Sequence, residues 1–144
     1  MSALVETVHP DHQHWAADDS DALLLKFEGG RIGIHSTTLT TPPRRDMAVV
    51  EGTLGRIMID SLEFGGDQIA LETPDEGITI VSVTPLEDGL FDLPMINDFA
   101  RATLSEGAGG SPPICSAQSG LAVQATIDAA FRSAASKQLE EIKY

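Results

Sequence analysis

The chain has 144 residues, and its 22 acidic against nine basic side chains give a formal net charge of −13. This charge repels the phosphates of nucleic acid and the anionic surface of a membrane, so we expect neither as a partner. A chain of this length predicts one domain over residues 1–144 with a core of its own. Cys115 is the one cysteine and no N-terminal run suits secretion or membrane spanning, so we expect a cytoplasmic protein.

The first expected elements are a short strand over residues 3–8 and a polar loop over residues 9–15. The loop carries imidazole and carboxylate groups that could bind a divalent metal, namely His9, Asp11, His12 and His14. Nothing rigid fixes these side chains, and the sequence pattern points to no second ligand group that would join them. The sequence therefore favours a solvated loop without a metal, and a metal-binding module is kept as an alternative.

The clearest local pattern is a hairpin over residues 23–37, with Gly29-Gly30 as a two-residue turn whose glycines permit positive φ. In that register Leu25 lies opposite Ile34 on the face assigned to the helices, and Leu24 lies opposite His35 on the other face. His35 is then an ordinary strand histidine near solvent or an interface, with substrate contact as the alternative.

Residues 37–46 form a polar connection that carries Arg44 and Arg45. Paired arginines can bind a carboxylate or a phosphate, although pairing with a local acid such as Asp46 is the simpler interpretation. They are the best anion-binding candidates in this acidic chain.

A second hairpin is expected over residues 47–60, with a four-residue loop at 52–55. This loop places Val50 opposite Ile57 and Glu51 opposite Arg56. Residues 68–72 and 78–83 add two more strands. No helix is expected between residues 22 and 83, which predicts a mainly antiparallel sheet.

Two amphipathic helices complete the chain. The first opens at Pro94, ends before Gly107 and places four residues on one face: Ile96, Phe99, Ala100 and Thr103. The second covers residues 119–135 and carries an expected Asp128–Arg132 surface pair. Its predicted apolar face comprises Leu121, Val123, Ile127, Ala130, Phe131, Ala134 and Ala135.

These elements predict an α+β fold, in which helices pack on one face of a mainly antiparallel open sheet. The other face is available for dimerisation, because Leu24, Val49 and Met58 leave apolar side chains on it. A homo-oligomer is the expected assembly.

Several stretches, in their order and spacing, resemble the C-terminal domain of the Gfo/Idh/MocA oxidoreductases. They are the strand before Gly29-Gly30, the run Glu51-Gly52-Thr53-Leu54-Gly55, Ile96 to Ala102, Pro112-Pro113-Ile114, Gly120 to Ala125 and Asp128 to Ala134. The resemblance covers nearly the whole chain. It implies a substrate and oligomerisation domain whose free sheet face joins two subunits, in an enzyme acting on a sugar, inositol or similar polyol.

Full members of this family place a Rossmann domain before this one, with a catalytic lysine in a Glu-Lys-Pro motif and an Asp-x-x-x-His pair. The lysines here are Lys26, Lys137 and Lys143, none followed by proline, and none of the four histidines has an aspartate four residues before it. Hydride transfer needs a held nicotinamide and a group that moves the hydroxyl proton. We therefore expect no catalytic residue and no cofactor binding by this chain alone, and NAD or NADP when a Rossmann domain completes it.

In such a completed enzyme Arg44, Arg45 and His35 are the candidates for substrate or phosphate contact. A separate Rossmann-domain chain is one possible partner. The alternative is a stand-alone, non-enzymatic module for dimerisation or small-molecule binding.

Overall fold

The computed structural model describes residues 1–40, 46–60, 68–83, 93–105 and 111–144. The chain divides into two compact units. The first comprises Met1–Pro42 with Asp98–Tyr144, and the second comprises Pro43–Asn97. The expectation of a single domain over residues 1–144 stays a prediction.

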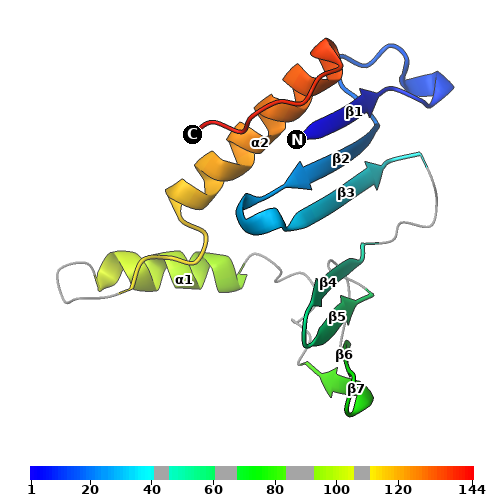
Figure 1. Ribbon diagram of the computed structural model, residues 1–144. Helices are drawn as coiled ribbons and strands as arrows, with labels where there is room; N and C mark the ends of the chain where they lie inside the picture. Colours follow the sequence, from blue (N-terminus) through cyan, green and yellow to red (C-terminus); the bar gives the residue numbers. More distant parts are fainter. Residues whose placement is uncertain (41–45, 61–67, 84–92, 106–110) are drawn as a thin grey trace. The chain divides into compact units, whose positions relative to one another are not determined.

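The first unit contains a three-stranded antiparallel sheet, formed by β1 (Ser2–Glu6), β2 (Ser20–Lys26) and β3 (Ile32–Thr38) in that spatial order (Figure 1). Cross-strand pairs place Ala3 beside Leu23 and Leu23 beside His35. One face therefore carries Ala3, Leu23 and His35, and the other carries the residues between them.

The register of the β2–β3 hairpin differs by one residue from the prediction. Leu23, not Leu24, lies opposite His35, and Leu24 lies opposite Ile34. The reason is a three-residue loop, Glu28–Gly30, closed by a hydrogen bond from the Phe27 N–H to the Arg31 carbonyl at 2.9 Å. Both loop glycines have positive φ. Glycine favours a three-residue loop for this reason as well as a two-residue turn. The predicted faces of Ile34 and His35 are thereby exchanged.

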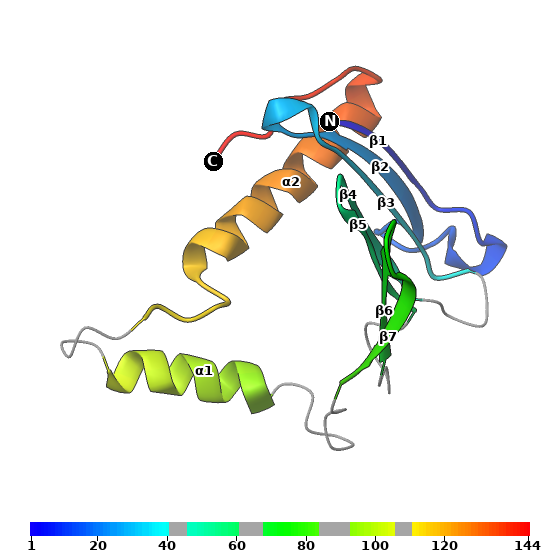
Figure 2. The ribbon, with the colours of Figure 1, turned by 60° about the horizontal axis from the view of Figure 1, so that its bottom comes forward.

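The helix α2 (Ala117–Ser136) lies along β1 in both views of the molecule (Figure 1, Figure 2). Its first turn is capped by the Ser116 hydroxyl, which accepts from the Ser119 N–H at 3.2 Å. The residues it buries are small: Ala125, Ala129, Ala130 and Ser133. Of the predicted face, Ala130 is buried and Ala134 is half-buried, but the large side chains such as Ile127 and Phe131 are exposed, because small side chains let the helix approach the strand closely.

The hydroxyl of Ser133 fastens this helix to the strand. It accepts the Ala3 N–H at 3.1 Å and donates to the Gln138 carbonyl at 2.6 Å, in a buried position. Beyond the helix, Met1 and Glu140 exchange backbone hydrogen bonds of 2.6 and 2.9 Å. The C-terminal tail thus runs back beside the start of β1. The predicted Asp128–Arg132 pair is present, and Arg132 also reaches Glu140.

The second unit contains a four-stranded antiparallel meander, in the order β4 (Ala48–Gly52), β5 (Gly55–Ile59), β6 (Gln68–Thr73) and β7 (Gly77–Ser82). The predicted pairs Val50–Ile57 and Glu51–Arg56 are confirmed. The loop is shorter than predicted, because Gly52 also pairs with Gly55. Gly55 has φ 147°, and a Cβ there would lie 2.1 Å from the Glu72 carbonyl oxygen, so a close approach of β5 to β6 requires this glycine.

The remaining helix, α1 (Leu93–Leu104), confirms the helix predicted at Pro94. None of its residues is buried, and Ile96 and Phe99 are exposed. Asp98 accepts from Arg101 and from the Ile114 N–H at 2.7 Å, so the chain that leads to α2 is held against α1. These two bonds hold the pKa of Asp98 below its ordinary value. The predicted end at Gly107 lies outside the described residues.

Two antiparallel sheets and two helices confirm the predicted α+β class. Val49 and Met58 are cross-strand partners and share a face, as predicted. Within the described parts of the chain, no helix is both long and apolar enough to cross a bilayer.

Candidate functional site

The residues predicted for anion binding fall outside the part of the chain that the structure describes. Arg44 and Arg45 belong to the segment 41–45, so their role stays a prediction. The third candidate, His35, lies on β3 and is described.

His35 stands next to a half-buried carboxylate, Asp21, on the same face of the first sheet. Asp21 pairs directly with Thr37, and Leu23 with His35, so Asp21 and His35 are diagonal neighbours. The His35 Nε2 atom lies 3.6 Å from Asp21 Oδ1, with the His35 side chain 56% exposed and that of Asp21 19% exposed. Among the described residues, the buried Oδ1 atom of Asp21 has no hydrogen-bond partner. A polar atom that is buried without a partner costs free energy.

A second carboxylate organises the loop between β1 and β2. Asp19, only 2% exposed, accepts the Val8 N–H at 2.8 Å and the His9 N–H at 2.9 Å. His12 Nδ1 and the Ser20 hydroxyl complete its partners, each at 3.0 Å. Burial alone raises the pKa of Asp19, but these hydrogen bonds outweigh it and lower the pKa to about 2. The carboxylate is fully satisfied and holds the loop as an anion.

The histidines of this loop are held in an aromatic stack. His12 stacks on Trp15 with ring centroids 3.6 Å apart, and His9 lies 4.5 Å from His12. The short helical turn Pro10–His12 orders the loop, which is therefore more structured than the solvated loop we predicted. Three metal-ligating side chains do not converge anywhere in the described residues.

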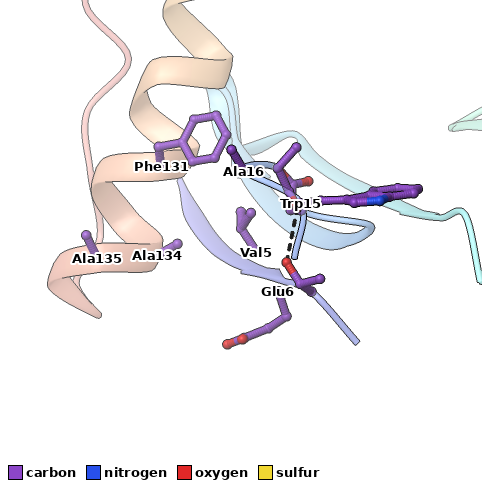
Figure 3. Close-up of a pocket in the computed structure, with 10 residues that line it drawn as sticks. Val5, Glu6, Trp15, Ala16, Phe131, Ala134 and Ala135 are labelled. Carbon is purple, nitrogen blue, oxygen red and sulfur yellow. Dashed lines mark hydrogen bonds between the residues drawn. The ribbon is translucent and has the colours of Figure 1, made fainter. Parts of the chain in front are cut away.

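An open groove of about 580 Å³ lies between the end of α2 and the loop after β1 (Figure 3). Val5, Ala16, Phe131 and Ala134 give it apolar walls, and the acidic residues Glu6 and Asp18 also line it. Val5 is the cross-strand partner of Asp21, so the groove borders the strand row that carries Asp21 and Thr37.

The second unit has a smaller groove of about 410 Å³ around Arg56. Arg56 pairs with Glu72 at 2.5 Å and with Glu51 at 3.7 Å. The hydrogen bond that Arg56 donates to Glu72, together with the negative charge of that carboxylate, raises the pKa of Arg56 above its ordinary value. Because two carboxylates already neutralise this guanidinium, it is a poor anion site.

Sequence reasoning missed both organising carboxylates. Asp19 and Asp21 belong to the acidic run 18–21, which carries the charge of a typical solvated loop. The available signal was the alternation of Asp19, Asp21 and Leu23 at the start of a strand, since such spacing directs alternate side chains to the same face.

Neither a family model nor a curated protein matches this chain. Several solved structures are similar to it, among them two oxidoreductases. An oxidoreductase domain protein from Kribbella flavida matches with a TM-score of 0.77 and 20% identity over 99% of this chain and 44% of its own. An oxidoreductase from Agrobacterium radiobacter, in complex with NAD⁺, L-tartaric acid and magnesium, matches with a TM-score of 0.71 and 22% identity over 95% of this chain.

The chain spans 44% and 41% of the length of these two proteins. It therefore has the fold of a part of an oxidoreductase.

Proposed function

We propose that this chain is the C-terminal substrate-binding and oligomerisation domain of an NAD(P)-dependent oxidoreductase of the Gfo/Idh/MocA type. The observation that carries the proposal is the fold match over 99% of this chain with less than half of an oxidoreductase domain protein. The order of the motifs from Gly29-Gly30 to Ala134 supports the same family.

In this proposal the chemistry is divided between two domains. A Rossmann domain holds NAD or NADP and supplies the catalytic lysine, and this chain presents a sugar, inositol or similar polyol to it. The chain alone is then not catalytically competent.

The free face of the first sheet supports the oligomerisation role. This face is apolar and exposed at Leu4, Leu24, Ile32 and Ile34, with Ile34 82% exposed. An exposed apolar surface of this kind favours self-association, and an isologous dimer would cover it with the same residues of a second subunit.

Calorimetric titration of the purified chain with NAD and NADP, together with light scattering, tests the proposal. We expect a dimer mass and no cofactor binding. Fusion of the chain behind a Rossmann domain of this family should then restore cofactor-dependent oxidation of a polyol. Cofactor binding in the micromolar range by the chain alone would contradict the proposed division of labour. A fusion that binds NAD yet turns over no polyol would favour a non-enzymatic dimerisation or small-molecule-binding module.

A further inference from the structure

We propose that the groove between the end of α2 and the loop after β1 binds a small organic cation, in which an ammonium group is joined to an aromatic body. The proposal goes beyond the proposed function and does not depend on it, because it concerns neither the polyol nor the nicotinamide cofactor. Three properties of the groove carry it: an apolar hollow, an ordered wall and negative charge.

Alanine side chains keep the groove open. Ala134 and Ala135 line it from α2, and Ala16 and Ala17 line it from the loop after β1. The Phe131 ring points from the helix toward Ala16 (Figure 3) and is 51% exposed. Because each alanine presents only a methyl group, a volume of about 580 Å³ remains, which is the size of a small-molecule site. A ligand that covers this ring removes apolar surface from water, which favours binding.

Hydrogen bonds hold the loop that forms one wall. The Thr7 hydroxyl donates to the Ala17 carbonyl at 3.1 Å, the dashed line in Figure 3. Asp19, two residues further on, accepts two backbone N–H groups of the same loop. The Trp15 ring, which also lines the groove, stacks on His12. A wall that is ordered before the ligand arrives loses little conformational entropy on binding.

The groove carries negative charge and no neutralising cation. Glu6 and Asp18 both line it, and none of the described residues that line it is lysine, arginine or histidine. Within the described ranges, neither of these two carboxylates forms an ion pair. Arg132 on α2 is already engaged by Asp128 and Glu140. The groove therefore attracts a cation and repels an anion.

The two kinds of wall together define the ligand. A bare ammonium ion would leave the Phe131 ring exposed, and a neutral hydrocarbon would leave the charges of Glu6 and Asp18 unbalanced. A molecule with both parts satisfies both, with its ammonium group beside the carboxylates and its aromatic body against Val5 and Phe131. Contact with an aromatic face adds to the attraction for the cation.

Titration of the full chain with phenethylamine, followed by the fluorescence of Trp15, tests the proposal. Trp15 is the single tryptophan of the chain and lines the groove. We expect a saturable change with a Kd of about 0.1–1 mM at low salt. Phenethyl alcohol has the same ring without the charge and should bind about tenfold more weakly, and the anion hydrocinnamate more weakly still. Salt at about 1 M should remove most of the difference between the amine and the alcohol.

Substitutions in the groove locate the binding. Asp18→Asn and Glu6→Gln should each weaken the binding of phenethylamine about threefold, because each removes one exposed charge. Asp11→Asn is the matched control, since it removes a carboxylate of the same loop that does not line the groove, and it should bind as the parent chain does. Ala16→Leu fills the groove from an exposed position and should weaken binding at least about tenfold.

Each outcome decides the proposal. Binding that weakens in Asp18→Asn, Glu6→Gln and Ala16→Leu, but not in Asp11→Asn, supports it. Equal affinity for the amine and the alcohol overturns the preference for a cation. Binding that Ala16→Leu leaves unchanged lies outside the groove and overturns the proposal. The same conclusion follows if phenethylamine causes no saturable change in Trp15 fluorescence or in the methyl resonances of the groove alanines.

The proposed function stands or falls separately, because cofactor and polyol binding test it. Thermal unfolding of each variant at the parental temperature shows that lost binding is not lost folding.

Discussion

At the scale of single residues, Asp19 shows how one carboxylate can hold a loop. Its two oxygens receive two backbone N–H groups, one imidazole and one hydroxyl, and each of these donors comes from a different residue. These bonds favour the anion over the protonated acid. The loop is therefore sensitive to acid at this one position.

The first prediction concerns pH. The pKa of Asp19 falls from 3.8 to about 2 on folding, so its contribution to stability is complete above about pH 4 and is lost as pH falls toward 2. Asp19→Asn should lower the free energy of unfolding at neutral pH. It should also weaken the decrease of that free energy between pH 4 and pH 2. Urea unfolding followed by Trp15 fluorescence across this range measures it. Asp18→Asn is the control, because the four donors bind Asp19 and not its neighbour; an equal effect of both variants would refute the assignment.

The second prediction concerns Gly55. An alanine Cβ at this position would lie 2.1 Å from the Glu72 carbonyl oxygen at φ 147°, so β5 and β6 must separate. We expect Gly55→Ala to cost about 2 kcal/mol or more of unfolding free energy. Gly52→Ala should cost much less, since its Cβ would make an ordinary contact at 3.7 Å. Hydrogen exchange of the β5 and β6 amides in the two variants compares them, and equal protection would contradict the prediction.

At the scale of elements, α2 shows why a hydrophobic stripe can mislead. The large apolar residues of this helix, Val123, Ile127 and Phe131, are exposed, and alanine and serine face β1. Hydrophobic periodicity predicted the helix correctly. It also predicted that the large apolar side chains form the buried face, and that part was wrong. Close contact between a helix and a strand needs small residues, and sequence patterns based on hydrophobicity give these little weight.

The third prediction tests that packing. Ala129 is fully buried against the strand, so Ala129→Leu should force α2 away from β1 and cost about 1–3 kcal/mol. Ala135→Leu, at an exposed position of the same helix, should change the stability by less than about 0.5 kcal/mol. Chemical denaturation of the two variants, with the same added side chain, separates packing from helix propensity. Equal destabilisation would mean that the buried face lies elsewhere.

The β2–β3 hairpin shows a similar limit of prediction. Both strands and both glycines were predictable from the sequence, yet the loop takes Glu28 as a third residue. A one-residue change in the loop moves His35 to the other face. In the β4–β5 hairpin the sequence offered a cross-strand ion pair, Glu51–Arg56, as a guide to the register. The register predicted there is confirmed.

At the scale of the whole molecule, the order of strands and helices and the α+β class could be predicted, because they follow from periodicity and from turn residues. The placement of Asp21, His35 and Thr37 on one face could not, since it depends on the hairpin register that one additional loop residue sets. Asp19 could not be predicted either, because its partners come together only when the loop folds over it.

The fourth prediction concerns assembly. Ile34 lies on the apolar face of the first sheet that we propose to be covered by a second copy. Ile34→Glu would bury a carboxylate against its own symmetry mate, and we expect the dimer Kd to rise at least about tenfold. Leu139→Glu adds the same charge at an exposed residue of the tail and should leave the mass unchanged. Sedimentation equilibrium distinguishes them; a dimer that persists in Ile34→Glu would place the interface on another surface.

The single thiol of this chain stands at a useful place. Cys115 is exposed between Ile114, which Asp98 holds against α1, and Ser116, which caps α2. A nitroxide attached there would be unique in each subunit and would sit on backbone fixed from both sides. Pulsed dipolar spectroscopy of the labelled chain would then give one distance for each symmetric dimer, and so a direct measure of how two copies are arranged.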